Sequence, residues 1–263
     1  MTALLQTIDA ATGVATLTLN RPEKRNALDS ELIGLLKDAV ESLDARADIR
    51  IITIEGAGDY FCAGGDIGSM IRVAQGSSYA NEQDALGLAR MLLVVDAVSK
   101  PTIALAKGVV VGGGVGLLAC CDIVIAADDA SFSLSEVRLG LLPAIVAPFL
   151  IRAIGLRQLR RYALTAERFG AAEAQMLGLV HRVTPKFELG LAHAAVVGDL
   201  LRGAPGAQAD VKSFFAECDG QGVEAELLRE AAHRLAARRK SAEALEGLTA
   251  FLQKRPPGWI AAH

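Results

Sequence analysis

Short apolar runs typical of β-strands alternate with helical segments between residues 4 and 183. Residues 4–9 and 14–19 form two such runs, and the Ala10-Ala11-Thr12-Gly13 stretch between them predicts a hairpin. Asp29 is expected to cap a helix, because the apolar positions that follow recur on one helical face (Leu32, Leu35, Leu36, Ala39, Val40 and Leu43). A β-branched run at 49–55 predicts a buried strand. This alternation indicates an α/β fold.

The remaining pattern predicts further strands and helices in the same alternation. Strands are expected at residues 102–106, 109–111, 122–127, 130–134 and 179–183, and helices at 84–98, 115–121, 147–153, 155–164 and 171–177. Small and polar residues at 72–84 predict a mobile loop. From residue 187 onward the pattern is helical. We therefore expect a core of residues 1–195 and a helical C-terminal region of residues 196–263.

Two glycine-rich junctions each follow a predicted strand and precede a predicted helix. One is Gly112-Gly113-Gly114, and the other is Phe61-Cys62-Ala63-Gly64-Gly65-Asp66-Ile67. The first turn of a helix leaves N–H groups unpaired and carries the positive end of the dipole, so such a junction suits a negative oxygen. Glycine clusters also serve as packing devices that let a helix touch a strand. The repetition of the arrangement favours a shared site.

Composition and charge exclude several function classes. The chain has 263 residues, of which 52% are hydrophobic, and 27 basic against 30 acidic residues give a net charge of -3, which does not favour nucleic acid or an anionic membrane. The four cysteines and four histidines lack metal-ligand spacing, so no metal site is expected. The sequence shows no basic leader segment and no apolar run of the ~20 residues that a membrane span needs. We therefore expect a soluble cytoplasmic protein.

A set of motifs in fixed order resembles the crotonase superfamily, the enoyl-CoA hydratases and isomerases. The resemblance implies a spiral of ββα units, a C-terminal helical region that packs as a homotrimer or as a hexamer made of two trimers, and an acyl-coenzyme A thioester as substrate with no permanently bound cofactor. The matching pieces are Asn20-Arg21-Pro22, Asn26-Ala27-Leu28, the junction at 61–67, Lys107-Gly108, Gly112-Gly113-Gly114, Cys121-Asp122-Ile123, residues 136–143 and Phe251-Leu252-Gln253-Lys254.

The same resemblance implies roles for individual residues. The backbone N–H groups of Ala63 and Gly113 would form an oxyanion hole around the thioester oxygen, and Glu136 would be the acid/base residue. Other positions are implied by family motifs or by their place near the site. Coenzyme A is expected to lie against Ala63, Gly65, Asp66, Ile67, Phe251 and Lys254, the last two usually from a neighbouring subunit, while Met70 and Leu141 would shape the acyl pocket.

Two departures from the family pattern bear on the reaction. Family hydratases carry a second glutamate in a GGGxE arrangement, whereas this chain has Gly116 at that place. The stretch after Pro143 is usually glycine-rich but here reads Ala144-Ile145-Val146-Ala147-Pro148-Phe149-Leu150. Together with residues 113–117 and 160–168, the second departure resembles bacterial members associated with the hydration of methylglutaconyl-CoA.

These features leave three functional hypotheses. The first is an enoyl-CoA hydratase-type lyase for a short or branched α,β-unsaturated acyl-CoA, with 3-methylglutaconyl-CoA as a candidate and Arg72 or Arg138 as candidate ligands of its distal carboxylate. The second is a Δ3,Δ2-enoyl-CoA isomerase that uses the single glutamate, motivated by Gly116. The third is a non-catalytic member of the fold that binds coenzyme A or RNA, with the basic residues at 234–240 as a contact.

Overall fold

The computed structural model describes residues 2–260, and a six-stranded sheet forms its centre. In sheet order the strands are β1 (Leu4–Asp9), β2 (Val14–Leu19), β3 (Ile51–Gly56), β4 (Thr102–Ala106), β6 (Ile123–Ala127) and β9 (Arg182–Thr184). The predicted hairpin is present, since β1 and β2 pair antiparallel, and all the other neighbours in this sheet are parallel. A second sheet has the order β5 (Val109–Val111), β7 (Ser131–Ser133) and β8 (Phe169–Gly170).

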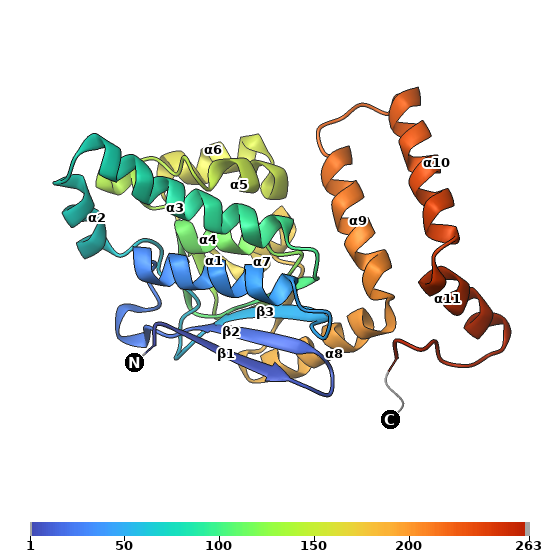
Figure 1. Ribbon diagram of the computed structural model, residues 1–263. Helices are drawn as coiled ribbons and strands as arrows, with labels where there is room; N and C mark the ends of the chain where they lie inside the picture. Colours follow the sequence, from blue (N-terminus) through green and yellow to red (C-terminus); the bar gives the residue numbers. More distant parts are fainter. Residues whose placement is uncertain (1, 261–263) are drawn as a thin grey trace.

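Helices cover both faces of the large sheet (Figure 1). On one face α1 (Ser30–Asp44), α3 (Ser78–Ala97) and α4 (Gly113–Ala119) bury their apolar sides in the main core. Apolar residues of three further helices also pack in this core: α5 (Ala147–Ile154), α6 (Leu156–Thr165) and α7 (Ala171–Leu177). Asp29 caps α1 as expected, because its side chain accepts the N–H of Leu32 at 2.9 Å. The short α2 (Ile67–Ala74) follows the second glycine junction.

The other face of the sheet is covered by α8 (Leu189–Arg202). Its residues Leu189 and Ala192 pack against Ile51, Ile103 and Ile125 in a separate buried cluster. Helix α8 runs without interruption through residues 195 and 196, where the core was expected to end. The boundary between the two regions stays a prediction, and the first helix that leaves the core is α9 (Pro205–Cys218).

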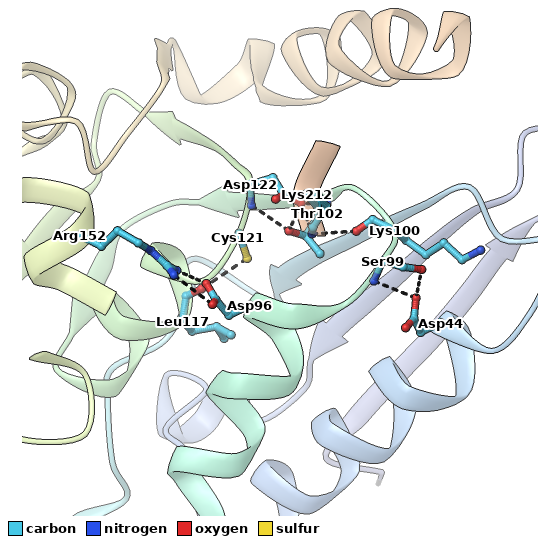
Figure 2. A network of polar contacts seen from close by, with 10 residues as sticks. All are labelled: Asp44, Asp96, Ser99, Lys100, Thr102, Leu117, Cys121, Asp122, Arg152 and Lys212. Carbon is cyan, nitrogen blue, oxygen red and sulfur yellow. Dashed lines mark hydrogen bonds and ion pairs between the residues drawn. The ribbon is translucent and has the colours of Figure 1, made fainter. Parts of the chain in front are cut away.

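Three helices project from the side of the core: α9, α10 (Ala225–Arg239) and α11 (Ala242–Leu252) (Figure 1). One lysine ties the projection to the sheet. Figure 2 shows Lys212 of α9 beside Thr102 and Asp122, and its Nζ lies 2.5 Å from Asp122 Oδ2 and 3.0 Å from the carbonyl oxygen of Lys100. Asp122 Oδ2 also accepts the N–H and the hydroxyl of Thr102. This anchor fixes the first projecting helix against the ends of β4 and β6.

The prediction of a long loop at residues 72–84 was wrong. Helix α2 continues to Ala74 and α3 begins at Ser78. The polar residues there terminate helices instead of forming a loop: Ser77 accepts the N–H of Ala80, and the Asn81 amide donates to the carbonyl oxygens of Val73 and Ser77. Strand β8 was not predicted, and β9 begins three residues later than expected.

Candidate active site

The two glycine junctions lie side by side. Cys62 forms an isolated bridge with Val110, and the Val111 N–H donates to the Cys62 carbonyl oxygen at 3.0 Å. Their closeness requires glycine, since a β-carbon at Gly114 would lie 2.6 Å from that same oxygen. Burial raises the pKa of the Cys62 thiol to about 12, so this cysteine is a packing residue and not a nucleophile. The junctions therefore form one structural unit.

Backbone hydrogen bonds decide which amides of this unit are available to a ligand. The Ala63 N–H donates to the carbonyl oxygen of Arg25 at 3.0 Å, and the Asp66 N–H donates to that of Leu28 at 2.8 Å. Within residues 2–260 the N–H groups of Gly65 and Gly113 have no acceptor. Gly65 is exposed and Gly113 half-buried. The Ala63 N–H that was expected to form half of the oxyanion hole is therefore already bonded to the backbone, whereas those of Gly65 and Gly113 are available.

The side chain of Glu136 lies against the central glycine turn. Glu136 begins the short 3-10 helix η2 (Glu136–Leu139), and a β-carbon at Gly112 would lie 2.8 Å from its Oε1. Gly112 also has φ +50°, a left-handed value that favours glycine. The Oε2 atom of Glu136 is buried and has no hydrogen-bond partner among the described residues. Burial raises the pKa of this carboxyl group, so it is poised to exchange a proton.

A half-buried guanidinium holds the loop that carries Gly65. Arg21 donates to the carbonyl oxygen of Ala27 at 2.5 Å, and its Nη2 lies 3.0 Å from Asp66 and 2.9 Å from Asp29. Asp66 in turn caps α2 by accepting the Ser69 N–H. That bond, followed by Arg21, holds the pKa of Asp66 below its usual value. The Asp66 carboxylate therefore supports the loop structurally.

Asn26 supports the same region through buried side-chain hydrogen bonds. It is fully buried with φ +58°, its amide donates to the carbonyl oxygens of Ala57 and Tyr60, and its Oδ1 accepts the Arg21 N–H. Sequence reasoning used Arg21 and Asn26 only as markers of the family motif and missed their positioning role. The polar residues on either side of Pro22, at positions 21 and 26, are the signal that could have revealed this role.

The structure brings some of the other expected residues to this unit and leaves others away from it. The sulfur of Met70 would lie 3.0 Å from a β-carbon at Gly65, so Met70 packs directly over that residue. Leu141 lies next to η2, where its N–H donates to the Glu136 carbonyl oxygen. Ile67 is half-exposed at the start of α2. Phe251 and Lys254 lie at the end of α11, which Figure 1 shows on the opposite side of the molecule from α2.

The sequence matches the family model of the enoyl-CoA hydratases and isomerases over residues 9–261. The chain belongs to this family. Among solved structures, the enoyl-CoA hydratase of Shewanella pealeana superposes with a TM-score of 0.94 and is 37% identical, covering 98% of this chain and 96% of that one. Pseudomonas aeruginosa AtuE also reaches 0.94, with 38% identity over 98% and 100% of the two chains. These similarities confirm the crotonase-like α/β fold and an enzyme of this family.

The family also includes relatives that differ in the named reaction. The hydroxycinnamoyl-CoA hydratase-lyase of Pseudomonas fluorescens is 33% identical over 216 residues, which cover 80% of this chain and 78% of the relative. The name of this relative and that of the Shewanella pealeana enzyme both include a hydratase activity, and they differ in the acyl group. Family membership therefore supports enoyl-CoA hydratase/isomerase chemistry without fixing the acyl substrate.

A separate cavity of this family member lies away from the glycine junctions. It measures about 1010 Å³, lies between α9 and the core, and is lined by none of Gly65, Gly113 or Glu136. Two ion pairs lie in its wall, since Arg152 binds Asp96 (Figure 2) and Lys212 binds Asp122. Within residues 2–260, no helix is long and apolar enough to cross a membrane. The glycine junctions with Glu136 remain the candidate active site.

Proposed function

We propose that the enzyme is an enoyl-CoA hydratase-type lyase acting on a short or branched α,β-unsaturated acyl-CoA. The observation that carries the proposal is the buried, unpartnered carboxylate oxygen of Glu136 beside a glycine turn. The free N–H groups of Gly65 and Gly113 supply two donors for a thioester oxygen. We assign the oxyanion hole to this pair, and Gly65 replaces Ala63 in that role.

The proposed reaction needs one carboxylate and two donors. As the water oxygen bonds to C3, the carboxylate of Glu136 accepts a proton from that water, and the π electrons move through C2 onto the thioester oxygen. The resulting enolate is the species that Gly65 and Gly113 stabilise, and such backbone donors are commonly worth ~3 to 4 kcal/mol each. Glu136 then returns its proton to C2, which completes the addition of water.

A branched substrate with a second carboxylate, such as 3-methylglutaconyl-CoA, is our candidate within this class. The Ala144–Leu150 stretch resembles bacterial members associated with that substrate. A distal carboxylate needs a cation, and Arg72 and Arg138 are exposed and make no ion pair within the described part of the chain. The cations of α10 suit an RNA contact less well, because Arg234 is bound to Glu217 and Glu230.

A Δ3,Δ2-enoyl-CoA isomerase is the second candidate, favoured by Gly116. The isomerisation uses the same enolate-type intermediate and consumes no water, so the absence of a second acid at residue 116 does not hinder it. Both candidates place Glu136 and the two donors in the same roles.

A thioester panel tests the proposed function. Purified enzyme is incubated with crotonyl-CoA, 3-methylglutaconyl-CoA and 3-hexenoyl-CoA, and the conjugated thioester absorbance is followed together with product analysis. We expect loss of conjugation with at least one 2-enoyl substrate. Gain of conjugation from the 3-enoyl substrate alone supports the isomerase instead. No turnover of any thioester contradicts both.

We propose further that three copies assemble through the projecting helices. These helices expose large apolar side chains that a lone chain would leave in water, among them Val211, Phe215, Leu228, Leu235, Leu245, Leu248, Phe251 and Leu252. A trimer would also bring Phe251 and Lys254 of one copy toward the coenzyme A of another. Sedimentation equilibrium should give a mass three or six times that of the chain, and a monomer at all concentrations would contradict the assembly.

A further inference from the structure

The space beside Gly116 is already occupied by another side chain. Gly116 lies in α4, one turn beyond the Gly113 donor, and it is fully buried. A β-carbon at Gly116 would lie 2.2 Å from Cγ1 and 2.7 Å from Cβ of Val146. Real contacts of a β-carbon are essentially never that short, so no side chain larger than hydrogen fits at residue 116 while valine is present.

Val146 is fixed in this position by its surroundings. It is 2% exposed, directly precedes α5, and belongs to the main core together with Val115 and Leu117 of α4. The surface facing Gly116 is therefore apolar. Between Lys107 and Cys121 the sequence contains no acidic residue, so α4 contributes no carboxylate to the site.

We propose that Val146 is a specificity-determining residue: it fills the place of a second acid and leaves Glu136 as the sole proton-transfer group of the site. The proposal rests on the proposed function of this site. The two sequence departures, Gly116 and the apolar stretch around Val146, are then one structural feature, because the glycine provides the space that the valine fills.

With a single carboxylate in the site, Glu136 must carry out every proton transfer of the reaction. With a 3-enoyl thioester, Glu136 removes a proton from C2, the C3–C4 double bond moves to C2–C3 by way of the enolate, and C4 receives the proton that Glu136 holds. No water is consumed. Hydration in a site with two carboxylates gains from an opposing group that orients the water, and this chain lacks that group at residue 116. The ratio of hydration to isomerisation should therefore respond to residues 116 and 146 together.

The steric part of the proposal is tested by matched glycine-to-alanine variants. Gly116→Ala should lower Tm by roughly 5 to 10 °C, because overpacking costs stability and each lost kcal/mol shifts Tm by a few degrees. Gly87→Ala is the control, since Gly87 also lies within a helix and a β-carbon there meets nothing within 4 Å. It should keep or raise Tm. A Gly116→Ala protein as stable as the control overturns the proposal.

Combined substitutions at residues 116 and 146 test whether Val146 causes the steric conflict. With Val146→Gly the nearest remaining atom to a β-carbon at 116 is the Val146 Cα, at an ordinary 3.6 Å. On the Val146→Gly background, Gly116→Ala should therefore no longer lower Tm relative to Val146→Gly alone. The Gly116→Glu, Val146→Gly double variant should raise the hydration-to-isomerisation ratio at least about tenfold.

The outcomes separate this proposal from the proposed function. A folded double variant with the wild-type ratio overturns the role of Val146, whereas the wild-type enzyme would still turn over thioesters. A wild-type enzyme that acts on no thioester of the panel overturns the proposed function, while the Tm comparison still decides whether Val146 fills the space.

Discussion

Replacing Glu136 by glutamine should lower kcat on the best enoyl-CoA substrate roughly 100- to 10,000-fold, the usual contribution of one positioned acid/base group. Glutamine has the same shape and can fill the same space beside Gly112, so the binding of the thioester should change little. The amide cannot accept a proton from water or from C2. Steady-state kinetics on wild type and variant measure both quantities, and a fall in kcat with an unchanged KM is the expected pattern.

The pH dependence of Tm in the Glu136→Gln variant tests whether the Glu136 carboxylate is buried. Burial raises the pKa of Glu136 above its ordinary value of 4.5, so the folded enzyme binds this proton more tightly than the unfolded chain does. Stability therefore falls as pH rises from 4.5 through the raised pKa, because the folded state must then hold a buried charge. Glutamine avoids this cost. The variant should melt above wild type at high pH, and the difference should shrink toward pH 4.5.

A second glutamate serves as the matched control for this experiment. Glu224 is exposed and its side chain makes no capping bond to α10, so Glu224→Gln should change neither kcat nor the pH dependence of Tm. Equal activity of Glu136→Gln and Glu224→Gln would remove Glu136 from the mechanism. A Glu136→Gln protein that is less stable than wild type at every pH would contradict the burial of its charge.

The Arg21→Met variant should lower the free energy of unfolding by about 3 to 5 kcal/mol, since it leaves two partly desolvated carboxylates without their cation. The side chains of Asp29 and Asp66 are 18% and 10% exposed, and Arg21 itself is 16% exposed. Because Asp66 follows the Gly65 donor, a loosened loop should also lower kcat, by up to roughly 100-fold for a donor displaced by an ångström. Urea unfolding and steady-state kinetics measure the two effects.

An exposed ion pair gives the comparison for Arg21. Arg46 contacts Asp48 at 2.6 Å, but these side chains are 42% and 64% exposed. Arg46→Met should therefore cost less than about 1 kcal/mol and leave kcat unchanged. If both arginine variants lose the same stability, the guanidinium of Arg21 does not organise the loop.

Local patterns predicted most of the fold. The one-face repeat after Asp29 indicated α1 and its cap, and the β-branched run at 49–55 indicated β3, because each depends on a period within one element. The polar stretch at 72–84 misled for a physical reason: Ser77 and Asn81 satisfy the helix ends on either side of a break of three residues. The same small polar residue types cap helices and occur in loops, so composition alone does not distinguish the two.

The site could be predicted only in part, because its details depend on contacts between distant residues. The motifs predicted roles for Gly113 and Glu136, which stay predictions, but the choice between Ala63 and Gly65 depends on a hydrogen bond to the Arg25 carbonyl oxygen. No local pattern shows which amide of a loop is already paired. The link between Gly116 and Val146 was hidden for the same reason, since the two residues meet only in the folded chain.

The contact between Gly116 and Val146 also constrains how such sites can change over time. If residue 116 became glutamate while residue 146 is valine, the new β-carbon would lie 2.2 Å from Cγ1 of Val146. The substitution would therefore lower the stability of the chain before it could add a second catalytic carboxylate. The reverse order, in which residue 146 first becomes small, passes through a folded intermediate with a cavity. The order of the two substitutions therefore matters, and a chain with valine at residue 146 does not gain a glutamate at residue 116 in a single step without losing stability.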